Sequence, residues 1–209
     1  MTGPVQAPTR AAVIEMKNEQ KVVNEAYIFL DEKRLLLASE LLRQLRLYQQ
    51  LNNEFETLQT QAKAAMQSAV MFHGLDGLQV YPAVTFDNAL FKQSTRNFMG
   101  VSLVETELST EHSKGTDATA SNPSGRAEYC RKLFREIVVQ SAVLAGLSGN
   151  LYRLLREYRL TERRSRALEN VILPEIKQSL REMSLHLEEL DLEDAIRVHL
   201  RSGIRSLSI

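Results

Sequence analysis

The chain has 209 residues, of which 44% are hydrophobic and 25% are charged, a composition that supports a folded protein. Its 26 basic residues balance its 26 acidic residues, so no net charge would draw nucleic acid or acidic lipid to it. A single cysteine, Cys130, excludes an internal disulfide and a multi-cysteine metal site.

The first residues lack the features of a targeting segment. Residues 1–8 have neither a basic flank nor an apolar core, so we expect no secretory signal here. No apolar run reaches the roughly 20 residues that a membrane-spanning helix needs. We therefore predict a cytoplasmic protein, a location that is compatible with work beside a membrane.

A long N-terminal helix is predicted over residues 9–73. Alternate steps of three and four residues from Leu30 visit thirteen positions, of which eleven are apolar. This seven-residue repeat puts one narrow apolar stripe on a helix and is typical of a left-handed coiled coil. The stripe consists of Leu30, Arg34, Leu37, Leu41, Gln44, Tyr48, Leu51, Phe55, Leu58, Ala62, Ala65, Ala69 and Phe72.

The middle of the chain has a different pattern. Residues 74–108 are predicted to form a small head, with strand-like runs at 78–86 and 98–104 and room for a short helix at 87–97. The head would lie at the far end of the paired helices. Residues 109–126 are polar and rich in Gly, Ser and Thr, which indicates a flexible loop.

A second long helix is predicted over residues 127–200. Its apolar stripe turns polar for one turn near Thr161 and Ser165 and then resumes in register, so Pro174 should kink the helix and not end it. Gly146 and Gly149 either weaken this helix or allow the close approach of another helix. The stripe consists of Cys130, Phe134, Ile137, Leu144, Leu147, Leu151, Leu155, Tyr158, Leu168, Ile172, Ile176, Met183, Leu187, Leu190, Ala195 and Val198.

Neither helix can bury its stripe alone, and the two are of similar length. The predicted fold class is therefore mainly α: a long antiparallel two-helix coiled coil, formed by the N- and C-terminal helices, with a small hairpin-containing middle head. We expect one coiled-coil domain overall, with both termini at one end.

Three segments, in order along the chain, carry a family resemblance. Residues 160–169, with Arg163-Arg164 and Ala167-Leu168-Glu169, are followed by an apolar run and Pro174, although Ser165 and Arg166 replace the more usual Val-Asn. The other two segments are a Pro-Thr opening followed by a Leu-x-x-Lys-Arg-x-x-Leu stretch, and an Asn-x-Met-Gly-Val segment. They lie at residues 8–10 with 30–37, and at residues 96–103, where Val104 replaces a common Pro.

Together these segments resemble the D-subunit family of V-type and A-type rotary ATPases (ATP synthases). The resemblance implies a non-catalytic central rotor stalk that transmits torque between the catalytic hexamer and a membrane ion-translocating ring, during ATP hydrolysis or synthesis. It also implies a location peripheral to a membrane. The implied partners are the catalytic and non-catalytic subunits of the hexamer, a small F subunit and a membrane-side socket subunit.

Two groups of residues are candidates for contact with these partners. One is a basic cluster, for which a solvated helix face, a rotor-partner contact and a nucleic-acid contact remain open; interleaved Glu residues and the lack of stacking aromatics count against nucleic acid. The other lies in the head. The candidates in the basic cluster are Arg159, Arg163, Arg164, Arg166 and Glu169, and the candidates in the head are Met99, Gly100 and Val101.

No pattern in the sequence indicates an enzyme. The four histidines are scattered, without a metal-ligand spacing, and Cys130 lies on the apolar stripe as expected of a buried structural thiol. We expect no cofactor, no bound metal and no catalytic residue. Two alternatives share the helical form: a coiled-coil stalk protein of a type III or flagellar export ATPase, and a generic helical adaptor.

Overall fold

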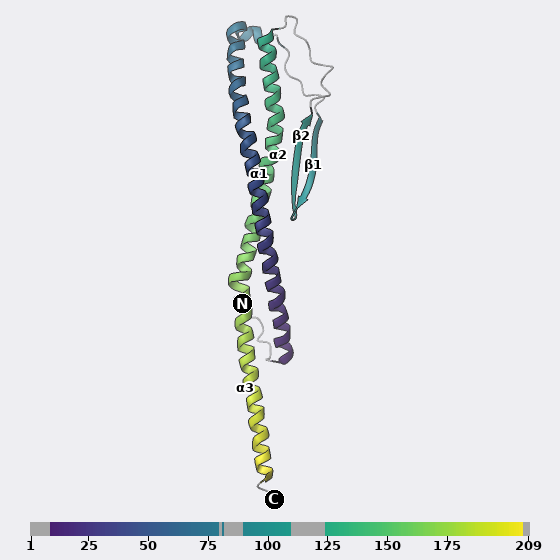
Figure 1. Cartoon of the computed structure of the whole chain (residues 1–209), viewed down its shortest axis with the longest axis vertical. Coiled ribbons are helices and arrows are strands. Elements are labelled where there is room, and N and C mark those ends of the chain that lie inside the picture. The colour runs from purple at the N-terminus through teal and green to yellow at the C-terminus, as the bar shows by residue number, and fades with distance from the viewer. Residues whose placement is uncertain (1–8, 80, 82–89, 110–123, 207–209) are drawn as a thin grey trace. The chain divides into compact units, whose positions relative to one another are not determined.

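The computed structural model describes residues 9–79, 81, 90–109 and 124–206. Two long helical stretches pack antiparallel, and a two-stranded hairpin lies between them in sequence (Figure 1). The predicted fold class is therefore confirmed. In chain order the elements are α1 (Arg10–Gln79), β1 (Leu90–Phe98), β2 (Val101–Ser109), α2 (Gly125–Ala167), η2 (Leu168–Ile172) and α3 (Leu173–Ser206).

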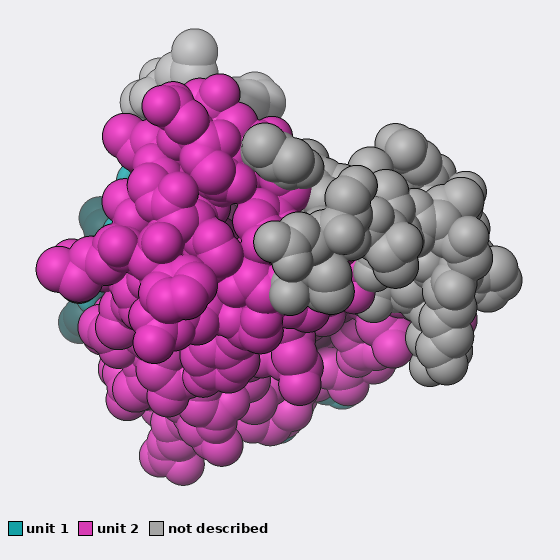
Figure 2. All heavy atoms as spheres, turned by 90° about the horizontal axis from the view of Figure 1, so that it is seen from above, with its two compact units in different colours: residues 1–35, 159–209 teal, residues 36–158 magenta. Residues whose placement is uncertain are grey.

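The chain divides into two compact units, each built from both helical stretches. Unit 1 comprises residues 1–35 and 159–209, and unit 2 comprises residues 36–158 (Figure 2). Unit 2 contains the hairpin. The expectation of one coiled-coil domain overall stays a prediction.

The start and end of α1 follow from local chemistry. The Thr9 hydroxyl accepts a hydrogen bond of 3.2 Å from the backbone N–H of Ala12, which is the usual capping arrangement at a helix start. At the other end, Gly74 leaves the helical conformation, with φ 71° and ψ 170°, at the predicted stop of the helix. Helix then resumes as far as Gln79, so the strand predicted from residue 78 is wrong for its first two residues. Residues 80 and 82–86 of that strand lie outside the described residues.

The predicted heptad stripe of α1 faces the second helical stretch. In unit 2, Ala62 and Ala65 pack against Cys130 and Leu133. In unit 1, Val13, which precedes the predicted stripe, packs against Ile176 and Leu180. Cys130 is buried, as predicted, and burial raises the pKa of its thiol. The last stripe position, Phe72, is an exception because it is 65% exposed.

The hairpin turns within two residues. Met99 and Gly100 both have positive φ angles, of 50° and 84°, as a type I′ turn requires, and Phe98 pairs with Val101 across the turn. The short helix predicted at 87–97 is therefore wrong over residues 90–97, which belong to β1. The turn escapes prediction because Met99 stands where Asn or Asp would usually signal it.

The hairpin packs on the side of the helix pair and not at its far end, which corrects the predicted position. Val101 and Leu103 of β2 form a buried core with Leu37 of α1 and Leu154 of α2. Figure 1 shows the hairpin beside α2. The cause is the alternation in β2, which gives the strand an apolar side that only the helices can cover.

The second helical stretch begins at Gly125 and contains a π-helical turn, η2. The backbone N–H of Leu173 bonds to the carbonyl of Leu168, five residues back, immediately before Pro174. Pro174 has no N–H to continue the helical ladder, and a π-turn is one of the ways in which a helix absorbs such a break. Most of the loop predicted at 109–126 lies outside the described residues, although Ser109 ends β2.

Candidate functional site

The predicted basic cluster lies on one short stretch of unit 1. It occupies the last turns of α2 and the start of η2, and all five candidate side chains are exposed: Arg159, Arg163, Arg164, Arg166 and Glu169. Arg166 forms an ion pair of 2.7 Å with Glu162, one turn earlier. Within the described residues, no ion pair engages Arg163 or Arg164. These two guanidinium groups are therefore available to a partner.

The inward side of the same turns explains the polar interruption of the stripe. Thr161 and Ser165 are only 1% and 2% exposed, so both point into the protein. Small polar side chains occupy the buried face here, while the arginines occupy the outer face. The break in the apolar pattern is thus a change in the size and polarity of the buried residues, and the helix keeps its orientation.

The second predicted group divides between surface and core. Met99 and Gly100 form the exposed tip of the hairpin, whereas Val101 is 6% exposed and belongs to the core beneath it. The tip therefore offers one large apolar side chain, that of Met99, to a partner. Val101 holds the tip in place.

A buried carboxylate joins the hairpin to α1, and sequence reasoning missed it. Glu40 accepts hydrogen bonds from Arg43 (2.8 and 2.7 Å), from Gln44 (3.0 Å) and from Arg96 of β1 (3.0 Å). The Arg43 hydrogen bonds contribute most to lowering the pKa of Glu40 from 4.5 to about 2, against the opposing effect of burial, and Gln44 and the charges of Arg43 and Arg96 add to the lowering. The same pairing raises the pKa of Arg43.

A buried amide joins the hairpin to α2. Asn150 accepts a hydrogen bond of 2.8 Å from the Val104 N–H and donates one of 2.7 Å to the Val104 carbonyl. Because Val104 directs these groups away from β1, the amide takes the place of a neighbouring strand. Nothing in the sequence around Asn150 signals this role, since its partner lies 46 residues away.

Gly146 gives β2 room to approach α2. The Thr106 hydroxyl donates a hydrogen bond of 2.7 Å to the Ala142 carbonyl, one turn before Gly146. A Cβ atom on Gly146 would overlap the Thr106 hydroxyl and lie 3.1 Å from its Cγ2 atom. The sequence suggested a close approach of a helix at Gly146 and Gly149, which is wrong: the neighbour at Gly146 is the strand β2, and at Gly149 no atom lies within 4 Å of an added Cβ.

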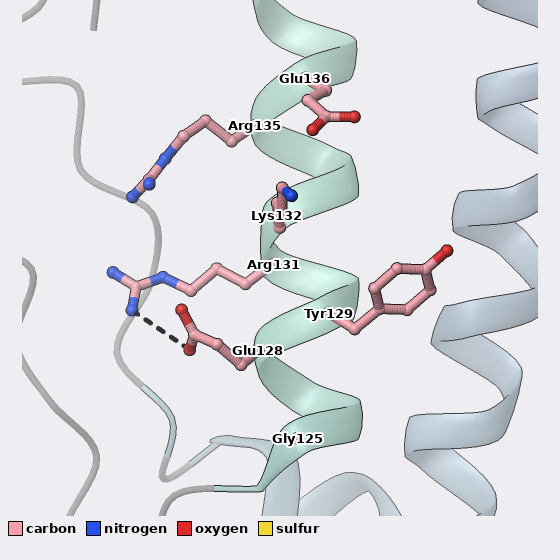
Figure 3. Close-up of a pocket in the computed structure, with 7 residues that line it drawn as sticks. All are labelled: Gly125, Glu128, Tyr129, Arg131, Lys132, Arg135 and Glu136. Atoms are coloured by element: carbon pink, nitrogen blue, oxygen red, sulfur yellow. Dashed lines mark ion pairs between the residues drawn. The ribbon is translucent and has the colours of Figure 1, made fainter. Parts of the chain in front are cut away.

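A pocket of about 510 Å³ lies on the first turns of α2, and Figure 3 shows the residues that line it. Arg131 and Arg135 project to one side of the helix, and Tyr129 projects to the other. Glu128 lies 3.9 Å from Arg131, so acidic and basic groups alternate along the wall. The lining residues are Gly125, Glu128, Tyr129, Arg131, Lys132, Arg135 and Glu136.

Two absences in the described part of the chain bear on other classes of site. No group of three or more His, Cys, Asp or Glu residues there is arranged to hold a metal ion. Likewise, none of the helices in that part is long and apolar enough to cross a membrane.

Comparison with known proteins gives consistent full-length matches. The sequence model of the family described as the ATP synthase D subunit matches residues 12–200. The V-type ATP synthase D subunit of Thermotoga neapolitana is 26% identical over 193 residues, covering 92% of this chain and 94% of that relative. The A-type ATP synthase D subunit of Thermococcus kodakarensis is 27% identical over 198 residues, covering 91% and 90%. The corresponding protein of Pyrococcus abyssi is 25% identical over 193 residues, with the same coverage.

Proposed function

Because this chain belongs to the D-subunit family of ATP synthases, we propose that it works as the central rotor stalk of a V/A-type rotary ATPase. In this role it transmits torque between the catalytic hexamer and the membrane ion-translocating ring and has no catalytic residue of its own. The observation that supports this role best is the antiparallel pairing of α1 with the second helical stretch in both units. Two helices that bury a shared stripe resist bending and twisting better than one helix does.

The packing of the pair suits a mechanical element. At Ala62, Ala65 and Ala69 the stripe is formed by the smallest apolar side chain, and all three are at most 9% exposed. Small side chains let helix axes approach closely, and close-packed interiors transmit strain with little compression. The hairpin adds a third element to this packing, because Arg96 bonds to Glu40 of α1 and Val104 bonds to Asn150 of α2.

The exposed arginines are the proposed contact with the stator hexamer or with the F subunit. Arg163 and Arg164 have the fixed, forked donors that pair best with carboxylates, and Arg159, Arg166 and Glu169 flank them. The Met99 tip of the hairpin is the second proposed contact. A membrane-side socket subunit completes the set of partners, and the chain itself stays outside the bilayer, on its cytoplasmic side.

The family match counts against the two alternatives considered from the sequence. An export-apparatus stalk or a generic adaptor shares the helical form, but neither would match the D-subunit family along residues 12–200.

The subunits that bind the chain in its native cells test the proposed assembly. A tagged chain purified gently from its native cells should bring down the catalytic and non-catalytic ATPase subunits with a small F-like protein. Recovery of the chain alone would refute the proposed assembly.

Charge reversal tests the contact surface in the same experiment. Arg163→Glu combined with Arg164→Glu should reduce recovery of the ATPase subunits, because repulsion replaces pairing at an exposed contact. Arg46→Glu combined with Lys63→Glu is the matched control, since both residues are exposed on α1 in unit 2. Equal recovery with both double variants would show that Arg163 and Arg164 form only a solvated face.

A further inference from the structure

A second basic surface in unit 1 lies between α1 and α3. It is a groove of about 330 Å³ with α1 as one wall and the first residues of α3 as the other. Three lysines and two side-chain amides line it, and none of the lining residues is acidic. The lining residues are Lys17, Gln20, Lys21, Asn24, Leu173 and Lys177.

The three lysines contrast with two arginines of the same unit that have carboxylate partners. Arg10 pairs with Asp191 at 3.0 Å, and Arg197 lies 3.6 Å from Glu193. In the part of the chain that the structure describes, no carboxylate pairs with the lysines of the groove. Lys17 and Lys21 stand one helical turn apart, where like charges repel each other and destabilise a helix. Pairing within the described part of the chain therefore does not explain this arrangement.

The spacing of the donors indicates what the groove fits. Lys17, Gln20, Lys21 and Asn24 follow one another at short helical intervals, so their donors form a row along α1. Lys177 faces this row from α3. Side chains one turn apart on a helix are neighbours, with Cβ atoms about 5–6 Å apart, so the row of donors pairs with several carboxylates of one acidic segment better than with one small anion. The volume exceeds that of a single ion, since one water occupies about 30 Å³ in the liquid.

We propose that this groove is the docking site for an acidic segment of a partner subunit in the rotary ATPase. Asp or Glu side chains of that segment pair with Lys17, Lys21 and Lys177, and its polar backbone meets Gln20 and Asn24. The inference rests on the proposed function, because it needs a partner assembled around unit 1. It extends the contact beyond the arginine cluster at residues 159–169 and adds α1 to the surface that the partner recognises.

Zero-length cross-linking in the assembled complex tests the proposal directly. A carbodiimide joins a lysine amine to a carboxylate only when the two are in contact, and mass spectrometry identifies both peptides. We expect Lys17, Lys21 or Lys177 to be joined to Asp or Glu residues of another subunit. Lys63, exposed on α1 in unit 2, is the control for indiscriminate reaction. Amine labelling of the groove lysines should also fall severalfold on assembly.

The outcomes separate this proposal from the proposed function. If the complex assembles and the three lysines stay fully labelled and uncross-linked, the docking site is refuted while the stalk function stands. If no complex is recovered, the stalk function itself fails. Protection by inorganic phosphate alone, in the isolated chain, would assign the groove to a free anion and also refute the docking site.

A variant gives a second readout. Lys17→Glu combined with Lys21→Glu should weaken assembly by about tenfold at low salt and flatten its salt dependence, as expected for a contact steered by charge. Circular dichroism should show an unchanged helix content, because both side chains are exposed. Assembly equal to that of Lys63→Glu, with the same salt dependence, would overturn the proposal.

Discussion

Gly146 and Gly149 offer a controlled comparison, because they lie close together in α2 and differ in what surrounds them. Alanine is favoured over glycine in a helix interior by about 1 kcal/mol. At Gly149 no atom lies within 4 Å of an added Cβ, so Gly149→Ala should raise the free energy of unfolding by up to that amount. At Gly146 the same gain meets the Thr106 side chain.

The cost at Gly146 can be worked from its contacts. The added Cβ overlaps the Thr106 hydroxyl, which forces β2 away from the helix and breaks the bond of that hydroxyl to Ala142. Overpacking costs about 1–3 kcal/mol, and a lost hydrogen bond costs about 0.5–1.5 kcal/mol. After the helix gain is subtracted, Gly146→Ala should lower the free energy of unfolding by about 0.5–3.5 kcal/mol.

Urea unfolding followed by circular dichroism measures both variants. The double variant Gly146→Ala with Thr106→Ala should recover part of the loss, because removal of the hydroxyl and methyl groups frees the space. If Gly146→Ala were as stabilising as Gly149→Ala, the packing of β2 on α2 described above would be wrong.

Three further changes test other parts of the structure. Glu40→Gln should destabilise the protein by about 1–3 kcal/mol at pH 6. Since the pKa of Glu40 is lowered to about 2 in the folded protein, the stability that its charge contributes is complete above pH 4.5 and is lost as the pH falls. The difference in urea midpoint between the two proteins should therefore shrink as the pH falls from about 5 towards 2. A loss that stays constant over this range would contradict the role of the charge. Asn150→Leu removes both hydrogen bonds to Val104, so it should lower the free energy of unfolding by about 2–4 kcal/mol and speed amide hydrogen exchange in β2. Unaltered exchange at Val104 would contradict the role given to Asn150. Pro174→Ala restores a backbone donor and should raise the thermal midpoint by several degrees, and an unchanged or lower midpoint would mean that the π-turn already relieves the break.

The helices can be predicted because their information is local and repeated. The stripe from Leu30 to Ala69 specifies one face of α1, and all of its positions are buried or half-buried. Helix ends are harder to predict: Gly74 marks a kink and not a stop, since helix resumes beyond it. A bend at Pro174 can be expected from the sequence, but the π-turn before it depends on backbone hydrogen bonding that side-chain periodicity does not show.

The hairpin and the surfaces can be predicted only in part. The position of the hairpin depends on Arg96 reaching Glu40 and on Val104 reaching Asn150, contacts between residues 56 and 46 positions apart. The arginine cluster is contiguous in sequence and is therefore visible there. The lysine groove is not, because Lys177 joins Lys17 and Lys21 only when α3 pairs with α1.

Rotation of the chain inside the assembled ATPase tests the central claim most directly. Met71 is 90% exposed and Cys130 is buried, so Met71→Cys with Cys130→Ser leaves one exposed cysteine in this chain. A bead is attached to that cysteine in complexes whose other subunits carry no reactive cysteine, while the hexamer is fixed to a surface. The stalk function predicts unidirectional rotation of the bead that needs ATP and stops when hydrolysis is inhibited. A bead that stays still while the same complexes hydrolyse ATP would contradict it.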